Sequence, residues 1–167
     1  MINFYINIQK NSKLLKIDQK HLHDHFDTEL VSGFTQFLIK TLGKDKAVKI
    51  IEMYYLGFYE SDVIFWQIDT DKNLRAGKLM AYNEVGKRQG IPRWWHRIKG
   101  GTCQLNQCFF GEHLIPYINK SIAIVESEKT ACVMTIINMT LTPIGKLLQI
   151  NGDLKLAGIV NFGTSKV

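Results

Sequence analysis

The segment from Ile122 to Met139 constrains the fold more than any other part of the chain. Ile122–Val125 is a short, uninterrupted apolar run, which is typical of a strand buried on both faces of a parallel sheet. Glu126 follows at once, and Ser127 is placed to cap the helix expected next. The chain ends at residue 167. Because one parallel crossover takes about 30 residues, we expect only the start of such a sheet to fit between Ile122 and that end.

Glu126 stands between this expected strand and the N-terminus of the expected helix. Open α/β sheets bind their ligands at the carboxyl ends of their strands. A carboxylate there can bind Mg²⁺ or act as a general acid or base. The alternative is that Glu126 and Glu128 only complement the positive end of the helix dipole. These residues alone leave both interpretations open.

Positive charge is concentrated in one segment of the chain. The net charge is +6, and between Lys72 and Gly101 the basic residues are opposed by a single acid, Glu84. A local excess of this kind is expected of a protein that binds a polyanion, although a solvated basic face gives the same pattern. The residues predicted to contact phosphates are Arg75, Lys78, Lys87, Arg88, Arg93, Arg97 and Lys99.

Two adjacent tryptophans interrupt the basic segment in the sequence Arg93-Trp94-Trp95-His96-Arg97. Cations interleaved with indoles suit single-stranded nucleic acid, because the cations follow the phosphates while the indoles stack on bases. The sequence therefore predicts Trp94 and Trp95 as stacking residues. The alternative is that one or both fill the core beside a basic loop, since indoles bury well.

The remaining pattern predicts an α+β fold. Apolar residues at helical spacing indicate two helices over residues 28–56, with Thr28 as the first N-cap and Gly43 between them. Val63–Tyr82 is typical of a β-hairpin, and Asn151-Gly152 indicates a second hairpin near the end.

These expectations divide the chain into three segments. They are an N-terminal arm and helical pair at 1–60, a small, basic, antiparallel β-sheet subdomain at 61–119, and a partial α/β segment at 120–167 that begins with strand, Glu126 and helix and ends in a hairpin. The N-terminal arm includes an alternating, strand-like stretch at residues 2–8.

Two further groups of residues have a metal-site appearance. His21, His23 and His25 alternate and could hold a metal, but a surface histidine cluster is the competing interpretation. Asp69 and Asp71 form a D-x-D pair in turn-forming sequence, where aspartate caps the turn in the competing interpretation. Three cysteines and no signal peptide predict a reduced, cytoplasmic protein, and no segment is apolar enough for the chain to be expected in a membrane.

Three segments together resemble the core of bacterial replicative primases. They are Val63–Ile68 with Leu74-Arg75-Ala76-Gly77-Lys78, then Cys108–Leu114, then Ile122–Ala131. In the primases a mixed α/β subdomain precedes a toprim subdomain. Residues 106–114 and 125–131 are more closely similar to a family of uncharacterised toprim-like proteins associated with bacterial mobile elements. The resemblance extends over residues 27–131.

The resemblance implies that Glu126 is the toprim glutamate, a catalytic residue that also helps organise Mg²⁺ with Glu128 as a weaker second ligand. In intact relatives this chemistry is Mg²⁺-dependent nucleotidyl transfer or strand cleavage. Toprim domains supply further carboxylates from a later D-x-D motif, but after Glu128 the only acid is Asp153. We therefore expect a catalytically incomplete protein. From about Cys132 the sequence departs from the family, a pattern that a frameshift or truncation produces.

Three hypotheses follow. The first is a primase-like, toprim-type DNA-binding protein related to replication of mobile elements, with single-stranded DNA and a replication protein as partners. The second is a non-enzymatic protein-interaction module, or the remnant of a split replication protein. The third is an active Mg²⁺ phosphotransferase that uses Asp69, Asp71 and Glu126.

Overall fold

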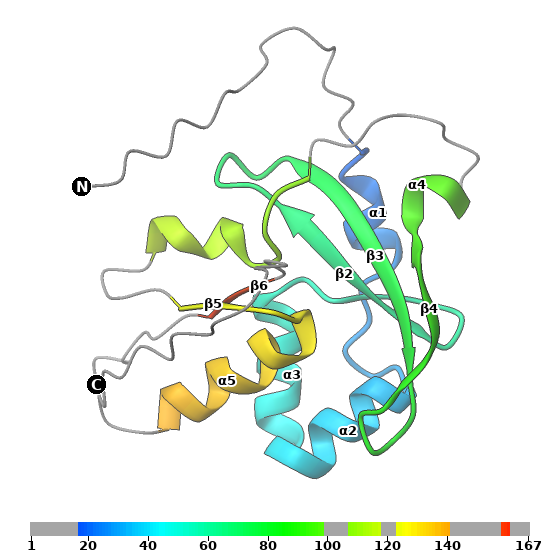
Figure 1. Cartoon of the computed structure of the whole chain (residues 1–167), viewed down its shortest axis with the longest axis vertical. Helices are drawn as coiled ribbons and strands as arrows, with labels where there is room; N and C mark the ends of the chain where they lie inside the picture. Colours follow the sequence, from blue (N-terminus) through cyan, green and yellow to red (C-terminus); the bar gives the residue numbers. More distant parts are fainter. Residues whose placement is uncertain (1–16, 99–106, 118–122, 141–157, 161–167) are drawn as a thin grey trace, which may run out of the picture.

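The computed structural model describes residues 17–98, 107–117, 123–140 and 158–160 (Figure 1). A four-stranded antiparallel sheet in the order β1-β2-β3-β4 lies at its centre. Its strands are β1 (Gly57–Tyr59), β2 (Asp62–Ile68), β3 (Leu74–Tyr82) and β4 (Arg88–Trp94). The helices before it are α1 (Lys20–Asp24), α2 (Gly33–Leu42) and α3 (Lys44–Met53). After it come α4 (Trp95–Ile98), the 3₁₀ helix η1 (Glu112–Tyr117), β5 (Ala123–Val125), α5 (Glu128–Thr140) and β6 (Gly158–Val160).

This order confirms the α+β class, with helices first, an antiparallel sheet next, and a strand and helix after it. The two predicted helices are α2 and α3, and Gly43 joins them with a positive φ of 88°. The predicted N-cap Thr28 is wrong. Ser32 caps α2 instead, because its hydroxyl accepts from the Thr35 N–H at 3.2 Å while the Thr35 hydroxyl accepts from the Ser32 N–H at 2.7 Å. This reciprocal pair satisfies two backbone donors and fixes the later start.

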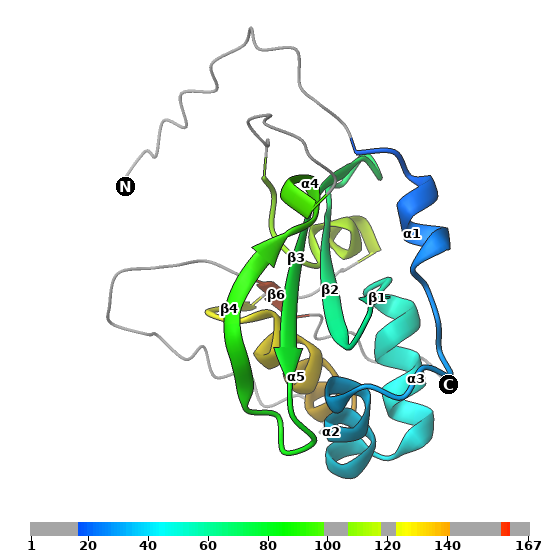
Figure 2. The ribbon, with the colours of Figure 1, turned by 90° about the vertical axis from the view of Figure 1, so that its right-hand side faces the viewer.

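The predicted hairpin is confirmed as β2 and β3. Its turn is capped by Asp69, whose Oδ1 accepts from the Asn73 N–H at 2.8 Å. This confirms turn capping as a role of Asp69. The sheet continues beyond the hairpin on both sides, with β4 at one edge (Figure 2). In β4 the residues 90–92 all stand opposite Met80, because Gln89 pairs with Ala81 and Arg93 pairs with Leu79. The edge strand therefore bulges at Gly90-Ile91-Pro92.

Each face of the sheet has its own apolar cluster. One face, here called the helix face, packs against α2, α3 and α5. Phe65 of β2 lies there in one cluster with Phe34 of α2 and Ile136 of α5. The opposite face carries Trp66 and Trp95. These three residues come one each from the three segments that the sequence analysis proposed, so a single core joins all three segments.

Strand β5 corrects the expectation of a parallel sheet. It pairs antiparallel with β6, with Val125 opposite Gly158. Ile124 is 45% exposed, so the strand is not buried on both faces. A continuous apolar run does not reveal the direction of its partner, and here the partner is β6, which comes from the C-terminal tail. The predicted strand at residues 2–8 and the Asn151-Gly152 hairpin lie outside the described residues.

The helix predicted after Glu126 is confirmed as α5, and Ser127 is its cap, since its Oγ accepts from the Thr130 N–H at 3.1 Å. None of the helices in the described ranges has the length and hydropathy that a membrane crossing requires.

Candidate functional site

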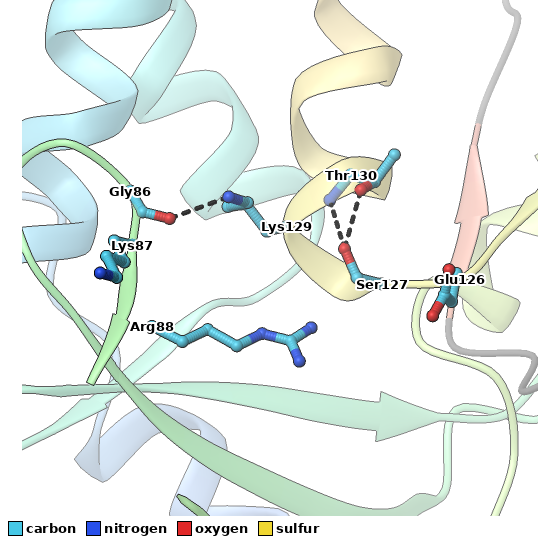
Figure 3. Close-up of a pocket in the computed structure, with 7 residues that line it drawn as sticks. All are labelled: Gly86, Lys87, Arg88, Glu126, Ser127, Lys129 and Thr130. Atoms are coloured by element: carbon cyan, nitrogen blue, oxygen red, sulfur yellow. Dashed lines mark hydrogen bonds between the residues drawn. The ribbon is translucent and has the colours of Figure 1, made fainter. Parts of the chain in front are cut away.

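An open depression of about 450 Å³ lies between the β3–β4 turn and the start of α5 (Figure 3). Two segments distant in sequence line it. The residues are Gly86, Lys87 and Arg88 from the turn and β4, and Glu126, Ser127, Lys129 and Thr130 from the start of α5. The basic turn and the strand–Glu–helix segment, predicted separately from the sequence, thus meet at one place.

The turn side of the depression is held by Asn83, whose Oδ1 accepts from the Lys87 N–H at 2.8 Å. Gly86 has a φ of 75°, and a Cβ there would lie 2.5 Å from the Phe37 ring of α2. The turn therefore needs glycine at this position for both its conformation and its seat on α2. Lys87 and Arg88 follow with exposed side chains, and no ion pair to either is found in the described ranges.

The helix side is joined to the turn by Lys129. Its Nζ donates to the Gly86 carbonyl at 2.8 Å and lies 5.4 Å from the centre of the Phe37 ring. Sequence reasoning missed this residue, because a lysine in the first turn of a helix carries no pattern of its own. Glu126 is exposed at the end of β5. Arg88 extends across the depression toward Ser127 and Glu126 (Figure 3).

Tyr82 of β3 stands opposite Arg88 of β4 in the sheet. Burial raises the pKa of the Tyr82 hydroxyl, and a hydrogen bond with Arg88 and its charge oppose that increase. This hydrogen bond keeps the Arg88 side chain on the helix face of the sheet, to which Tyr82 belongs.

Glu128 does not share the exposure of Glu126. Its two carboxylate oxygens accept from the Lys78 Nζ at 2.9 and 3.0 Å. The Glu128 side chain is 4% exposed and that of Lys78 is 18% exposed. Both predicted site residues are therefore engaged in an interior ion pair that joins β3 to α5.

Two other predicted phosphate contacts are also paired. Arg75 Nε donates to Asp69 Oδ2 at 2.6 Å, and both side chains are largely buried. Burial of the Asp69 carboxyl favours its neutral form, but hydrogen bonds from Asn73 and the interaction with Arg75 outweigh this and hold its pKa below the usual 3.8. Arg93 donates to Asp62 at 2.8 Å and stays 44% exposed.

Of the predicted cations, Lys87, Arg88 and Arg97 are thus exposed and without an ion pair to the described residues. Lys99 lies outside the described part of the chain.

The two tryptophans have different environments. Trp95 is 1% exposed and packs against Trp66 at 5.6 Å and His25 at 4.5 Å between ring centres. This burial corrects the prediction of Trp95 as a stacking residue, because no face of its ring is open to a base. Trp94 is only partly buried and keeps that role available. His21 and His25 both lie against Trp95, so two of the three alternating histidines contribute to packing.

A Mg²⁺ site of the kind implied by the toprim resemblance does not fit the described residues. Metal-assisted phosphoryl transfer uses several carboxylates around the ions. Here the Glu128 carboxylate is ion-paired with Lys78 and the Asp69 carboxylate with Arg75, so neither is free to bind a metal ion. No group of three or more His, Cys, Asp or Glu side chains that could hold a metal occurs in the part of the chain that the structure describes.

Comparison with known proteins identifies the chain's family. Neither the curated proteins nor the solved structures contain a match. A family described as "Domain of unknown function (DUF6371)" matches residues 32–151. The match begins at the N-cap of α2, includes both sides of the depression, and runs beyond Ala131, where the primase-like resemblance ends. The chain therefore belongs to the DUF6371 family.

Proposed function

We propose that this protein binds the phosphate backbone of nucleic acid at the depression between the β3–β4 turn and α5. One observation carries the proposal: Lys87 and Arg88 line the same depression as Glu126 and the start of α5. Together with the resemblance to primase cores, this supports a primase-like DNA-binding protein related to replication of mobile elements. A reduced, cytoplasmic setting fits Cys108 and Cys132, which are both free thiols.

The form of the site suits an extended polyanion. The depression is open to solvent, whereas sites for small molecules enclose most of the ligand. Lys87 and Arg88 project from a turn whose shape is set by Asn83 and Gly86. Lys129 holds that turn against α5. Two cations on a braced turn are positioned to contact phosphates without reorganisation.

In this proposal Glu126 is a neighbour of the bound backbone rather than the centre of a reaction. Its carboxylate is exposed beside Arg88, and it belongs to no group of three or more potential metal ligands among the described residues. Nucleotidyl transfer with Mg²⁺, which the resemblance implies for intact relatives, requires carboxylates from a replication-protein partner or from residues outside the described ranges.

Fluorescence anisotropy of a labelled single strand of about 20 nucleotides tests the proposal. The variant K87E/R88E is compared with K46E/K49E, which makes the same charge change at exposed positions of α3. At about 50 mM salt we expect K87E/R88E to bind at least about tenfold more weakly and the control to bind nearly as the native protein does. The salt slope should become shallower by about 1.4, since each contact to a single strand contributes about 0.7.

Equal loss in both variants would show binding by net charge alone and would contradict the site. Absence of binding by the native protein at about 50 mM salt would contradict the function itself.

The protein-interaction hypothesis relies on exposed strand edges. Within the described residues, β5 is paired with β6 and the edge strand β4 is interrupted by its bulge. This leaves the interaction hypothesis with less support than nucleic-acid binding. It predicts self-association that depends on protein concentration, measured by sedimentation, together with no response to E126A.

A further inference from the structure

We propose that the bound nucleic acid is single-stranded, and that it runs from the depression along the helix face of β4 to Trp94, where a base stacks on the indole. This inference deepens the proposed function and rests on it. It names Trp94 as the residue that distinguishes single strands from duplexes.

The register of the sheet places Arg88 and Trp94 on the same face. Arg88 stands opposite Tyr82 of β3, and Trp94 stands opposite Lys78. Residues directly opposite each other in an antiparallel pair project to the same side of the sheet. Tyr82 belongs to the core of the helix face, and Lys78 is bound to Glu128 of α5 on that face. Arg88 and Trp94 therefore both border the helix face at the free edge.

The separation of the two residues matches a short run of nucleotides. Tyr82 and Lys78 are four residues apart on β3, which corresponds to about 13 Å along a strand. Stacked nucleotides rise about 3.4 Å each along one strand, so no more than about four nucleotides separate the phosphate site from the stacking site. An indole and a cation at this spacing form the combination by which single-strand-binding proteins hold a backbone and a base.

The carboxylate nearest to Trp94 in the register is paired. Lys78 stands opposite Trp94 and neutralises Glu128 at 2.9 Å. The exposed carboxylate of Glu126 lies at the other end of the path, in the depression that Lys87 and Arg88 also line. Beyond Trp94, the His96 ring lies 6.4 Å from the indole and Arg97 is exposed. The path therefore leads from Lys87 and Arg88, across a neutral pair, to an aromatic side chain with a further cation after it.

Trp94 is also the one tryptophan that is not fully buried, which gives the test a direct signal. The chain has 3 tryptophans, and Trp66 and Trp95 are 0% and 1% exposed. Quenching of intrinsic fluorescence by a bound base consequently reports on Trp94. A duplex keeps its bases stacked on each other, so it can occupy the cationic site but offers no free base face to the indole.

The experiment titrates native protein, W94A and W94F with a single strand of about 20 nucleotides, the corresponding duplex, and heparin as a polyanion without bases. We expect the single strand to quench the native protein's fluorescence and to bind W94A about tenfold more weakly. W94F should retain most of the affinity, because phenylalanine also stacks, but lose the quenching. Heparin should bind all three proteins alike and should bind K87E/R88E weakly.

The outcomes separate the two proposals. If single strand, duplex and heparin all bind, K87E/R88E weakens all three, and W94A binds the single strand as the native protein does, the phosphate site stands and the role of Trp94 is overturned. If no polyanion binds the native protein at about 50 mM salt, the proposed function fails and this inference fails with it. Near-native emission from Trp66 and Trp95 in the variants verifies that they are folded.

Discussion

At the scale of single residues, the ion pair between Lys78 and Glu128 separates two glutamates that are close in sequence. The Glu128 side chain is 4% exposed and bound by Lys78, whereas Glu126 is exposed. Removing one partner of a buried pair leaves an uncompensated charge and costs about 3 kcal/mol or more. We expect E128Q to lower the free energy of unfolding by that amount in urea denaturation, and the matched control E126Q to leave it unchanged.

Replacing both partners of this pair, in K78M/E128L, should restore most of the lost stability, because an apolar pair of similar size removes the buried charge. A double variant as unstable as E128Q would mean that the pair is not the cause.

His113 makes the stability of the protein depend on pH. It is 1% exposed, its Nε2 hydrogen-bonds the Met53 carbonyl at 3.1 Å, and its Nδ1 is buried without a partner among the described residues. Burial lowers the pKa of the ring below 6.5, and the bond to Met53 only partly opposes this. The unfolded chain therefore binds the proton more readily than the folded chain does. Stability contributed by the neutral ring is present above about pH 6.5 and is lost as the pH falls below it.

The variant H113Q should reduce this acid dependence, because a glutamine amide can donate to the Met53 carbonyl but does not titrate. The measurement is the difference in unfolding free energy between about pH 7.5 and about pH 5.5 for both proteins. The same difference in H113Q and native protein would assign the acid sensitivity to other groups, such as His21, whose pKa is also lowered by burial.

Sequence reasoning at this scale identified Lys87, Arg88 and Glu126 of the depression. It missed Lys129 and could not distinguish the paired cations from the unpaired ones. Lys78 and Lys87 are both lysines of the basic segment, yet of the two only Lys78 has a carboxylate partner among the described residues, and that partner is 50 residues away in the chain. Trp94 and Trp95 are adjacent, and one of them fills the core as the alternative interpretation expected. Which one depends on the pairing of β4 with β3, which no local pattern contains.

At the scale of elements, the contact between α2 and the end of β3 is set by Gly33. A Cβ at this position would lie 1.9 Å from the Tyr82 carbonyl oxygen, a backbone atom that cannot turn aside. We expect G33A to displace α2 and to lower the free energy of unfolding by about 2–3 kcal/mol. Gly43 provides the control, because it has open space around it and only its φ of 88° opposes a side chain.

The control variant G43A should cost about 1 kcal/mol. Urea denaturation of both variants measures the difference, and a G33A protein no less stable than G43A would refute the close contact.

The elements that local patterns predicted are those with a buried periodic face or a continuous apolar run. Helices α2 and α3 and strand β3 carry such faces. Strand β2 is buried along its whole length, and its apolar run together with the turn residues after it predicted the hairpin. Strand β4 was not predicted, because its residues are exposed and show no alternation of burial. Strand β1 is three residues long, and β5 takes its partner from far along the chain. The position of each of these strands in its sheet depends on its pairing with another strand, which the local sequence does not encode.

At the scale of the whole molecule, the shared core predicts cooperative unfolding. Phe34, Phe65 and Ile136 come from the three segments that the sequence suggested and lie in one cluster. We expect circular dichroism, which follows the helices, and tryptophan fluorescence, which follows Trp66 and Trp95, to give the same urea midpoint. Two separate midpoints would show that the segments unfold independently.

The bulge at residues 90–92 has a consequence for the behaviour of the protein at high concentration. A free edge strand offers unpaired backbone groups to strands of other copies, which is the route to fibrils. Here the three bulged residues break the row of groups along β4, and Pro92 supplies no N–H. The molecule can thus leave the face beside β4 open to a ligand while its edge offers no template for self-propagating polymers.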